Sequence, residues 1–395
     1  MGTHGCITCI SRDGHDSGSY PLNLFERSCT FGRNPTSCIV IKRDSTSRDH
    51  AKIILDADVV SLVHLSKTGV TIIHGETSDA ERLDAYGAQV ELFDADVIEI
   101  DSRLFRFDGR DLIEGNDVAG NVHSVGDGVT KFKVGDRVAG FSKMFTEDKY
   151  GAYAEYTVVP EHTTFHVKEN VKIEDAATIG LAGMTAALGL FTESKLGLPT
   201  PENPNTGDRA VFINGASSSV GSFAVQLAKK AGLFVIGTAG SSIKVAKDAG
   251  ADVVIDYRGK STDDLVNLIK DAAKGKTLEH SYDAISERES FSLSCYVLPP
   301  QTTSKATFVL PIPKDLDSKG VTTTQTNVGT AHSVDAEFAE RYYTLIADWM
   351  NEGSFKGNNV KIVPQGLNGV HSGLELLKNN SVNGEKLVYK ISDTL

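Results

Sequence analysis

Apolar and polar residues alternate along roughly the first 110 residues, and this pattern changes in the second half of the chain. Short apolar runs such as Cys6–Ile10, Ala51–Leu55 and Val97–Ile100 recur at close spacing, with no helical period between them. Several short strands at such spacing predict an all-β sandwich. Residues 115–165 are rich in Gly, Val and Asp and predict a few further short antiparallel strands.

After residue 180 the pattern becomes an alternation of strands and helices. We predict strands at 210–214, 233–238, 252–256 and from about Tyr282, and helices at 220–231, 242–249 and 261–274. Strands that alternate with helices in this order build a doubly wound parallel α/β sheet of the Rossmann type. The chain is therefore expected to be multidomain, with an all-β part followed by an α/β part.

Length and composition agree with a globular protein of two or three domains. The chain has 395 residues, of which 40% are apolar and 23% charged, and a single core rarely extends over that length. The net charge of −12 argues against a nucleic-acid partner, which would need a basic surface. No apolar run reaches the length of a bilayer span, so we expect no membrane association and a cytoplasmic or nuclear location.

The five cysteines are scattered and odd in number, which favours a reducing compartment over a disulfide framework. Cys6 and Cys9 have the spacing of a metal-binding pair, but they lack a second close pair and also fit a strand. After residue 114 the only cysteine is Cys295. We therefore expect no metal site.

Two polar motifs stand in the predicted sandwich. Arg33 follows a Gly at the end of one apolar run, and the sequence Ser47-Arg48-Asp49-His50 precedes another. This arrangement resembles the forkhead-associated (FHA) domain, of the Ki-67 antigen type, over roughly residues 5–110. The resemblance implies a phosphothreonine-peptide reader in which Arg33 and Ser47 bind the phosphate and Arg48 flanks it. An arginine fork suits a dianionic phosphate.

One position departs from the FHA pattern. The family has Asn before a Gly in a later loop, where it orients the peptide, and this chain has His74 there. We expect His74 to take that place at the peptide, with altered peptide preference. The alternative is a structural sandwich in which these polar residues only hold turns together.

Six segments in register are similar to the medium-chain dehydrogenase/reductase superfamily, and in particular to its zinc-independent quinone and enoyl reductases. They lie at 114–141, 151–159, 174–191, 215–232, 250–258 and 366–391. The resemblance implies a GroES-like barrel joined to a Rossmann domain. We expect an FHA-like sandwich at 1–112, a partial barrel at 113–180, a Rossmann domain at 181–328 and a completing segment at 329–395.

The sequence "GASSSVG", from Gly215 to Gly221, follows a predicted strand and opens a predicted helix. A nucleotide pyrophosphate needs close backbone approach, exposed amides and the positive end of a helix. Serines are small enough for that approach, and their hydroxyls can donate to phosphate. We predict that this loop binds pyrophosphate through Gly215, Ser217, Ser218, Ser219, Val220 and Gly221; the alternative is a capped loop without a ligand.

The end of the second Rossmann strand predicts NADPH as the cofactor. An NAD site has a carboxylate there, and this chain has no acid between Val235 and Asp248. The resemblance implies that Ser241, Lys244 and Tyr257 hold the 2′-phosphate. The alternative is a solvated helix start that Ser241 caps.

Thr185 matches a family threonine near the nicotinamide and ribose. A buried helical threonine that bonds its own backbone is the alternative. The residues identify no general acid, so the catalytic residues stay unassigned, and water or the substrate would supply the proton.

Two features depart from the reductase pattern. The strands that precede the motif at 114–141 in the family are missing, which predicts an unpaired sheet edge, and Pro299-Pro300 replaces a glycine pair.

We expect an NADPH-dependent oxidoreductase that transfers hydride to an electron-poor C=C bond or quinone in a small molecule. The resemblance also implies a homodimer. The alternative function is an adaptor for a threonine-phosphorylated protein, whose reductase half is impaired or structural.

Overall fold

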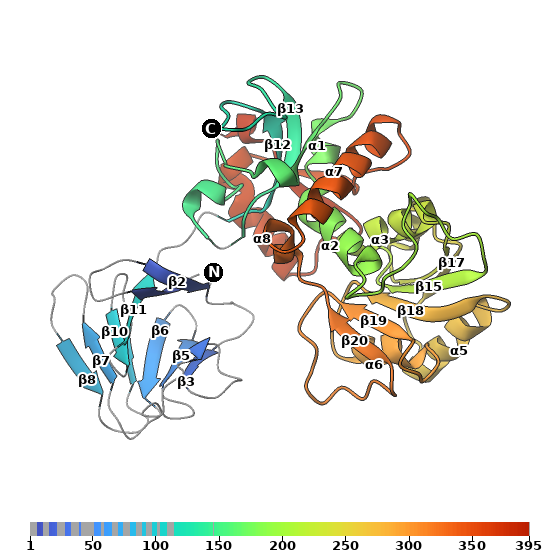
Figure 1. The fold of residues 1–395 in the computed structure, drawn as a ribbon, viewed down its shortest axis with the longest axis horizontal. Coiled ribbons are helices and arrows are strands. Elements are labelled where there is room, and N and C mark those ends of the chain that lie inside the picture. The colour runs from blue at the N-terminus through green and yellow to red at the C-terminus, as the bar shows by residue number, and fades with distance from the viewer. Residues whose placement is uncertain are drawn as a thin grey trace. The chain divides into compact units, whose positions relative to one another are not determined.

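The computed structural model describes residues 114–144 and 146–394 and, before them, the backbone of eleven strands between Cys6 and Asp108. The chain divides into two compact units, one of residues 1–114 with 145–148 and one of the remaining residues. Each unit has its own sheets (Figure 1). Within the described residues, no helix is long and apolar enough to cross a membrane.

The first unit is all-β, as predicted, and its strands form two sheets. One has the order β2-β1-β11-β10-β7-β8 and the other the order β4-β3-β5-β6-β9. Two of the strands have no apolar run in their sequence, since β2 is rich in Gly and Ser and β8 is half polar. The bounds are β1 Cys6–Ile10, β2 Asp16–Pro21, β3 Ser28–Gly32, β4 Ile39–Val40, β5 Ala51–Asp56, β6 Val59–His64, β7 Val70–Ile73, β8 Ala80–Leu83, β9 Gln89–Glu91, β10 Val97–Ile100 and β11 Arg103–Asp108.

The second unit contains a parallel sheet of six strands in the order β17-β16-β15-β18-β19-β20. The direction of winding reverses between β15 and β18, and in such sheets a ligand binds at the carboxyl ends of the strands flanking the reversal. The strands are β15 Arg209–Asn214, β16 Phe234–Ala239, β17 Val253–Asp256, β18 Thr277–Asp283, β19 Lys305–Phe308 and β20 Thr322–Gln325. The intervening helices are α3 Ser219–Lys230, α4 Ile243–Asp248, α5 Thr262–Ala272 and α6 Glu289–Tyr296.

The predicted doubly wound fold is confirmed, with one boundary corrected. Strand β18 begins at Thr277, earlier than the start predicted near Tyr282. The first half of the strand includes Glu279 and His280, and His280 is buried. A buried strand is predicted from a continuous apolar run, and the polar residues of β18 interrupt that run.

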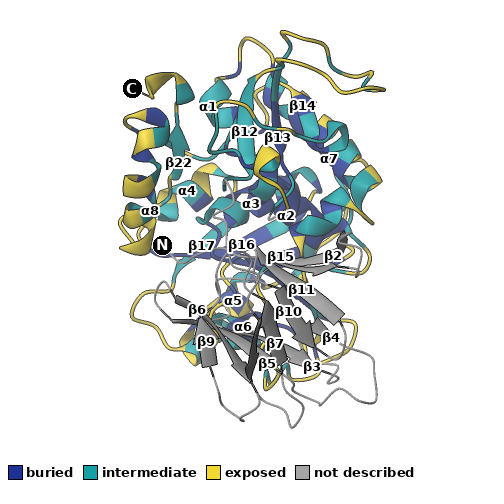
Figure 2. Cartoon of the chain, turned by 90° about the vertical axis from the view of Figure 1, so that its left-hand side faces the viewer, coloured by how far each residue is buried: buried dark blue, intermediate teal, exposed yellow. Residues whose placement is uncertain are grey.

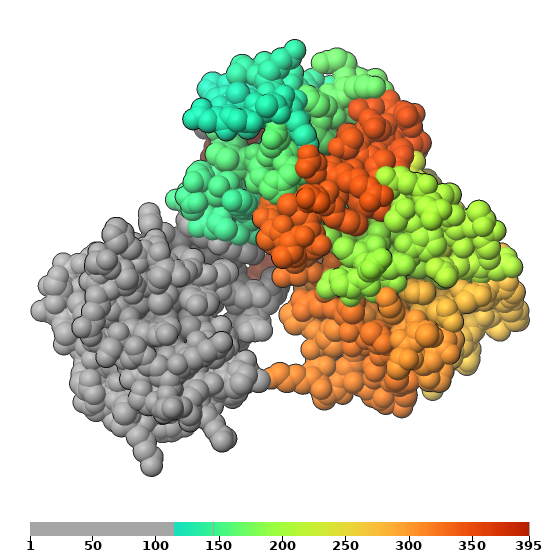
Figure 3. All heavy atoms as spheres, in the orientation of Figure 1, coloured from blue at the N-terminus to red at the C-terminus, as the bar shows by residue number. Residues whose placement is uncertain are grey.

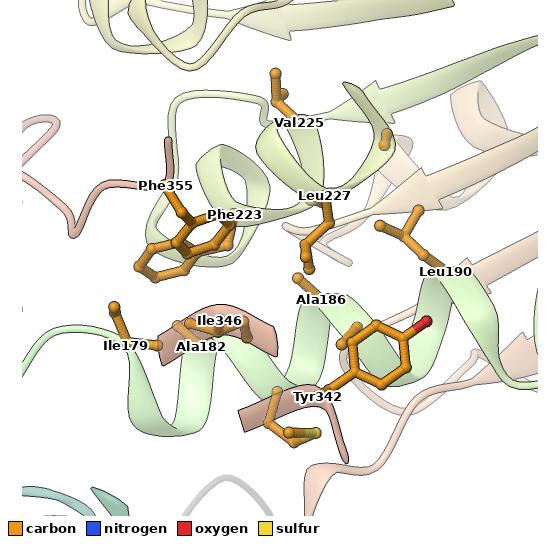
Figure 4. Close-up of a cluster of buried hydrophobic side chains, with 14 of the residues drawn as sticks. Ile179, Ala182, Ala186, Leu190, Phe223, Val225, Leu227, Tyr342, Ile346 and Phe355 are labelled. Atoms are coloured by element: carbon orange, nitrogen blue, oxygen red, sulfur yellow. The ribbon is translucent and has the colours of Figure 1, made fainter. Parts of the chain in front are cut away.

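Three helices enclose the main core of the second unit: α2 (Gly180–Phe191), α3 and α7 (Ala336–Asn351). Ala182, Ala186 and Leu190 follow one another at intervals of four residues on α2, so they share a face. That face meets residues of α3 and α7 in Figure 4, among them Phe223, Leu227, Tyr342 and Ile346. Alanines on α2 allow close helix approach, and Figure 2 shows α2 and β15 as mostly buried.

The partial barrel consists of an antiparallel sheet, β12-β13-β14, formed by Asp117–Asn121, Arg137–Phe141 and Thr164–His166. The later strands β21 (Val360–Val363) and β22 (Lys386–Tyr389) pair with each other in parallel. Helices α1 (Ile173–Ala176) and α8 (Val370–Lys378) complete the unit. In Figure 3, the orange-red residues of α7 lie between the teal and green barrel segment and the yellow-green residues of the Rossmann part.

Asp117 of β12 ties three distant segments together. Its Oδ1 accepts the backbone N–H of Leu181 at the start of α2, and its Oδ2 accepts the Lys386 ammonium of β22 at 2.7 Å. The Asp117 side chain is 12% exposed. A carboxylate at a helix start also meets the positive end of the helix dipole. This residue therefore fixes the barrel segment against α2.

We predict that Asp117→Ala lowers the free energy of unfolding by about 1–3 kcal/mol, because a half-buried ammonium and a helix N–H lose their acceptor. Thermal and denaturant unfolding measure the loss. Asp127→Ala, in an exposed loop, is the matched control and should change the stability by less than about 0.5 kcal/mol. Equal stability losses in the two variants would contradict this role of Asp117.

Candidate cofactor site

The turn between β15 and α3 lies at the point where the winding of the sheet reverses. Gly215 has a φ of +73°, which residues with side chains rarely adopt. The amides of Ala216 and Ser218 bond the carbonyls of Thr238 and Gly215, each at 2.8 Å. A Cβ on Gly221 would lie 2.1 Å from the Gly215 carbonyl oxygen. The two glycines that remain in the motif are thus the two that the turn requires.

The three serines of the loop have different partners. Ser218 is the N-cap of α3, and its Oγ accepts the Gly221 amide at 3.0 Å. The Ser219 hydroxyl bonds Oδ1 of Asn358 at 2.5 Å. Within the described part of the chain, the Ser217 side chain has no hydrogen-bond partner. The hydroxyls of Ser217 and Ser218 therefore remain available as donors, whereas Ser219 has to leave Asn358 first.

Three backbone amides of this loop, those of Ser217, Ser219 and Val220, have no hydrogen-bond acceptor among the described residues. All three residues are partly exposed. Unpaired amides at the first turn of a helix carry partial positive charge and bind anions. The donor set fits a pyrophosphate.

Ile285 lies against the other side of the turn. A Cβ on Gly215 would be 2.4 Å from the Ile285 Cγ1 atom, and the Ile285 side chain is 36% exposed. This contact closes the Gly215 face of the turn and leaves the Ser217–Val220 face partly open. The loop thus has one apolar wall and one polar face.

A buried polar network at the same sheet edge was missed by the sequence analysis. Asp283, at the end of β18, is fully buried. It accepts the amides of Ile285 and Ser286 at 3.0 and 2.8 Å, and the Asn214 amide at 3.2 Å. The Ser294 hydroxyl donates to its second oxygen at 3.2 Å. Asn214 in turn accepts the Thr238 hydroxyl, so the ends of β15, β16 and β18 are linked.

Two non-glycine residues after Asp283 have positive φ, Ser286 at 56° and Arg288 at 38°. The Ser286 hydroxyl bonds the Asp283 carbonyl, and the Val309 amide donates to it. Such bonds hold a backbone conformation that would otherwise be unfavourable. The sequence signal for this network was that neighbouring parallel strands end in the polar residues Asn214 and Asp283.

Ser241, Lys244 and Tyr257 follow β16 and β17 at the carboxyl edge of the sheet. Ser241 is exposed, and its hydroxyl lies 3.4 Å from Oδ1 of Asn383. The Lys244 side chain is 85% exposed and pairs with Asp248 at 2.5 Å, one turn further along α4. The Tyr257 hydroxyl lies next to Gly240, where it would be 2.7 Å from an added Cβ. A common 2′-phosphate site for these three residues stays a prediction.

Asp256, the carboxylate at the end of β17, already pairs with an arginine. Arg258 binds both oxygens of Asp256, and this pairing holds the pKa of Asp256 at about 2. Strand β16 itself ends in Ala239. Among the described residues, β16 itself therefore contributes no carboxylate at its end, where an acceptor for a ribose hydroxyl would be needed.

Thr185 is buried in α2, and its hydroxyl donates to the Leu181 carbonyl at 2.7 Å. This is the backbone bond that the sequence analysis named as the alternative. The Thr185 carbonyl accepts the hydroxyl of Tyr282 at 2.9 Å. A contact of Thr185 with a nicotinamide stays a prediction.

The other predicted site residues lie outside the described residues: Arg33, Ser47, Arg48 and His74, all for the phosphopeptide. The side chains of Cys6 and Cys9, where no metal site is expected, also lie outside them. Among the residues that are described, no three His, Cys, Asp or Glu side chains cluster as metal ligands. Burial raises the pKa of the Cys295 thiol to about 12, which makes it unreactive.

Three family models match the chain. The FHA domain matches residues 29–101, the alcohol dehydrogenase GroES-like domain residues 88–169, and the zinc-binding dehydrogenase model residues 219–347. The predicted FHA and reductase resemblances are thereby confirmed. The GroES-like match begins before the motif at 114–141 and overlaps the FHA match.

Curated relatives include trans-enoyl reductase fsr4 of Gibberella fujikuroi, which is 37% identical over 64% of this chain and 75% of its own. Trans-enoyl reductase resD of Aspergillus sclerotiorum is 32% identical over 71% of this chain and 85% of its own. Among solved structures, the Escherichia coli quinone oxidoreductase complexed with NADPH superposes with a TM-score of 0.55 at 24% identity. It covers 70% of this chain and 82% of its own, and shows the same fold.

We predict that Gly221→Ala lowers the free energy of unfolding by about 2 kcal/mol or more, because the added methyl would overlap the Gly215 carbonyl. Urea unfolding measures the change. Gly126→Ala is the matched control, since a Cβ there meets nothing within 4 Å. Unchanged stability of the Gly221 variant would show that α3 does not need this close contact.

Proposed function

The chain belongs to the medium-chain dehydrogenase/reductase family, and from this premise we propose that it transfers a hydride from NADPH to an electron-poor C=C bond or a quinone. Its relatives named as trans-enoyl reductases support reduction of an enoyl group, and the quinone oxidoreductase fold supports a quinone as the alternative acceptor. When bound, a nicotinamide cofactor supplies the hydride. The rest of the chemistry depends on how this chain holds its two substrates.

The observation that carries the proposal is the set of unpaired amides at the start of α3. Ser217, Ser219 and Val220 present three N–H groups beside a helix N-terminus, and no described residue accepts from them. The hydroxyls of Ser217 and Ser218 can add two further donors. These groups would bind the pyrophosphate, as the glycines of the usual motif do by leaving their own amides accessible.

The preference for NADPH over NADH rests on charge. A 2′-phosphate is a dianion and needs donors and cations, and Ser241, Lys244 and Tyr257 supply them. In the free protein Lys244 pairs with Asp248. When NADPH binds, the 2′-phosphate would replace the Asp248 carboxylate as the partner of Lys244. The 2′-hydroxyl of an NAD ribose would have no carboxylate to donate to at position 239, because the residue there is Ala239.

The proton that completes the reduction is assigned to water or to the substrate. Asp283 is the only buried carboxylate among the described residues near this edge, and it accepts four hydrogen bonds. Both oxygens of this carboxylate thus already accept from groups of the protein itself. Asp283 is therefore proposed to position the strand ends.

We predict that Lys244→Ala weakens NADPH binding about tenfold, the equivalent of about 1.4 kcal/mol for one charge-assisted contact. NADH binding should not change, because NADH lacks the 2′-phosphate. Fluorescence titration of the full chain measures both. Lys247→Ala, on the same helix and also exposed, is the matched control and should leave both affinities unchanged.

Two results would contradict the proposal. Wild-type protein that binds neither NADPH nor NADH would refute the reductase function itself. Equal losses for the two cofactors in the Lys244 variant would refute only the 2′-phosphate site. NADPH oxidation in the presence of an enoyl thioester or a benzoquinone then identifies the acceptor.

A second function is favoured by the match of residues 29–101 to the FHA domain. We propose that this part binds a threonine-phosphorylated peptide through Arg33, Ser47, Arg48 and His74. If the reductase part does not turn over, the protein would act as a phosphopeptide-binding adaptor. The two functions use separate residues and are compatible.

Arg33→Ala is predicted to abolish binding of threonine-phosphorylated peptides, because the phosphate loses its bidentate donor. NADPH affinity should not change. Calorimetry with a phosphorylated peptide library and its unphosphorylated counterpart measures this, and Arg110→Ala is the control. Undiminished binding by the Arg33 variant would remove the mechanism proposed for this part.

A further inference from the structure

Two histidines meet where three segments of the second unit come together. His162 lies in a short 3-10 helix, η2 (Glu161–Thr163), directly before β14, and His332 ends another, η3 (Val328–His332), directly before α7. Their rings are edge-to-face, with centroids 5.7 Å apart. On the other side, the His332 ring packs against Phe141 at 4.6 Å.

One nitrogen of each ring lies against a backbone carbonyl. Nε2 of His332 lies 3.1 Å from the carbonyl oxygen of Ser142, and the Ala331 carbonyl bonds the His162 ring. Nδ1 of His332 and Nε2 of His162 are buried and have no hydrogen-bond partner in the described part of the chain. A neutral imidazole has one N–H and one lone pair, so both rings suit this site only when neutral. A second proton would create a buried N–H with no acceptor.

The charges around the pair also oppose protonation. Burial lowers the pKa of both rings most. Lys143, after β13, and Lys131, in the loop before β13, lower the pKa of His162 further, and the neighbouring His162 and Lys143 lower that of His332. Glu161, on the same short helix, acts in the opposite direction. Glu340 of α7 pairs with Lys131 and offsets part of its charge.

The contacts of the pair connect the barrel segment to the remainder of the second unit. Ser142 follows β13 and His162 precedes β14, so both belong to the segment that connects these strands, whereas η3 links β20 to α7 and packs on α2. We propose that His162 and His332 form an acid-sensitive latch, which holds the β13–β14 segment against η3 and α7 only while both rings are neutral. This proposal does not depend on the cofactor or on the reaction.

The direction of the pH effect follows from burial. Burial lowers the pKa of His332 to about 4 and also lowers that of His162, whereas a histidine in an opened segment has its ordinary pKa of about 6.5. The opened state thus takes up more protons as the pH falls below about 6.5. The latch is fully closed above that pH and weakens progressively toward pH 4.

Hydrogen exchange of the full chain tests the latch. Between pH 7.5 and pH 5.0, after correction for intrinsic exchange rates, peptides covering 141–144, 160–164 and 328–333 should open at least about tenfold more often in the wild type. In the double variant His162→Asn/His332→Gln, whose amides replace one ring donor each but do not titrate, this increase should be absent. His371→Gln, at an exposed histidine on α8, is the control and should behave as the wild type.

His280 also has its pKa lowered to about 4 by burial, but it lies in β18. Its effect should appear in the β18 peptides of all variants alike. A wild type that opens no more at pH 5.0 than at pH 7.5, or a double variant that opens as the wild type does, would overturn the latch. If the double variant does not fold, NMR titration of the wild type decides: ring pKa values near 6.5 for both histidines would overturn it, and values below about 5.5 would support it.

Discussion

The contact between Gly221 and the Gly215 carbonyl fixes where helix α3 begins, and the candidate cofactor site depends on it. Because no side chain separates the helix start from the turn, the first amides of α3 lie at the carboxyl edge of the sheet, where the winding reverses between β15 and β18. Ser218 caps the helix and accepts the Gly221 amide, and among the described residues nothing accepts the amides of Ser217, Ser219 and Val220. A helix end in this state favours an anionic ligand.

The remainder of the second unit holds this edge in place. The polar network around Asp283 links the ends of three neighbouring strands, and Asn358, which precedes β21, bonds Ser219 and Ser222 of α3. On the other side, α2 packs between α3 and α7, and Asp117 connects its start to β12 and β22. A barrel segment of three strands is thus anchored by packing on helices and by a shared carboxylate, in addition to its own strand pairing.

Much of this arrangement could be predicted from the sequence. The change from alternating to β/α patterning located the two kinds of fold, and the small residues at 215–221 located the turn, because backbone geometry alone restricts those positions. The hydrogen-bond partner of each serine could not be predicted, since that of Ser219 is Asn358, more than a hundred residues away. The start of β18 and the role of Asp283 were hidden for a related reason: buried polar residues are stabilised by tertiary hydrogen bonds that leave no local periodicity.

The central claim is that serines and unpaired amides at the start of α3 bind the diphosphate of a nicotinamide cofactor. A crystal structure of the full chain grown with NADPH tests it most directly. The account predicts pyrophosphate oxygens within about 2.7–3.2 Å of the Ser217, Ser219 and Val220 amides. A cofactor bound elsewhere, or a turn that holds no cofactor at saturating NADPH, would contradict it.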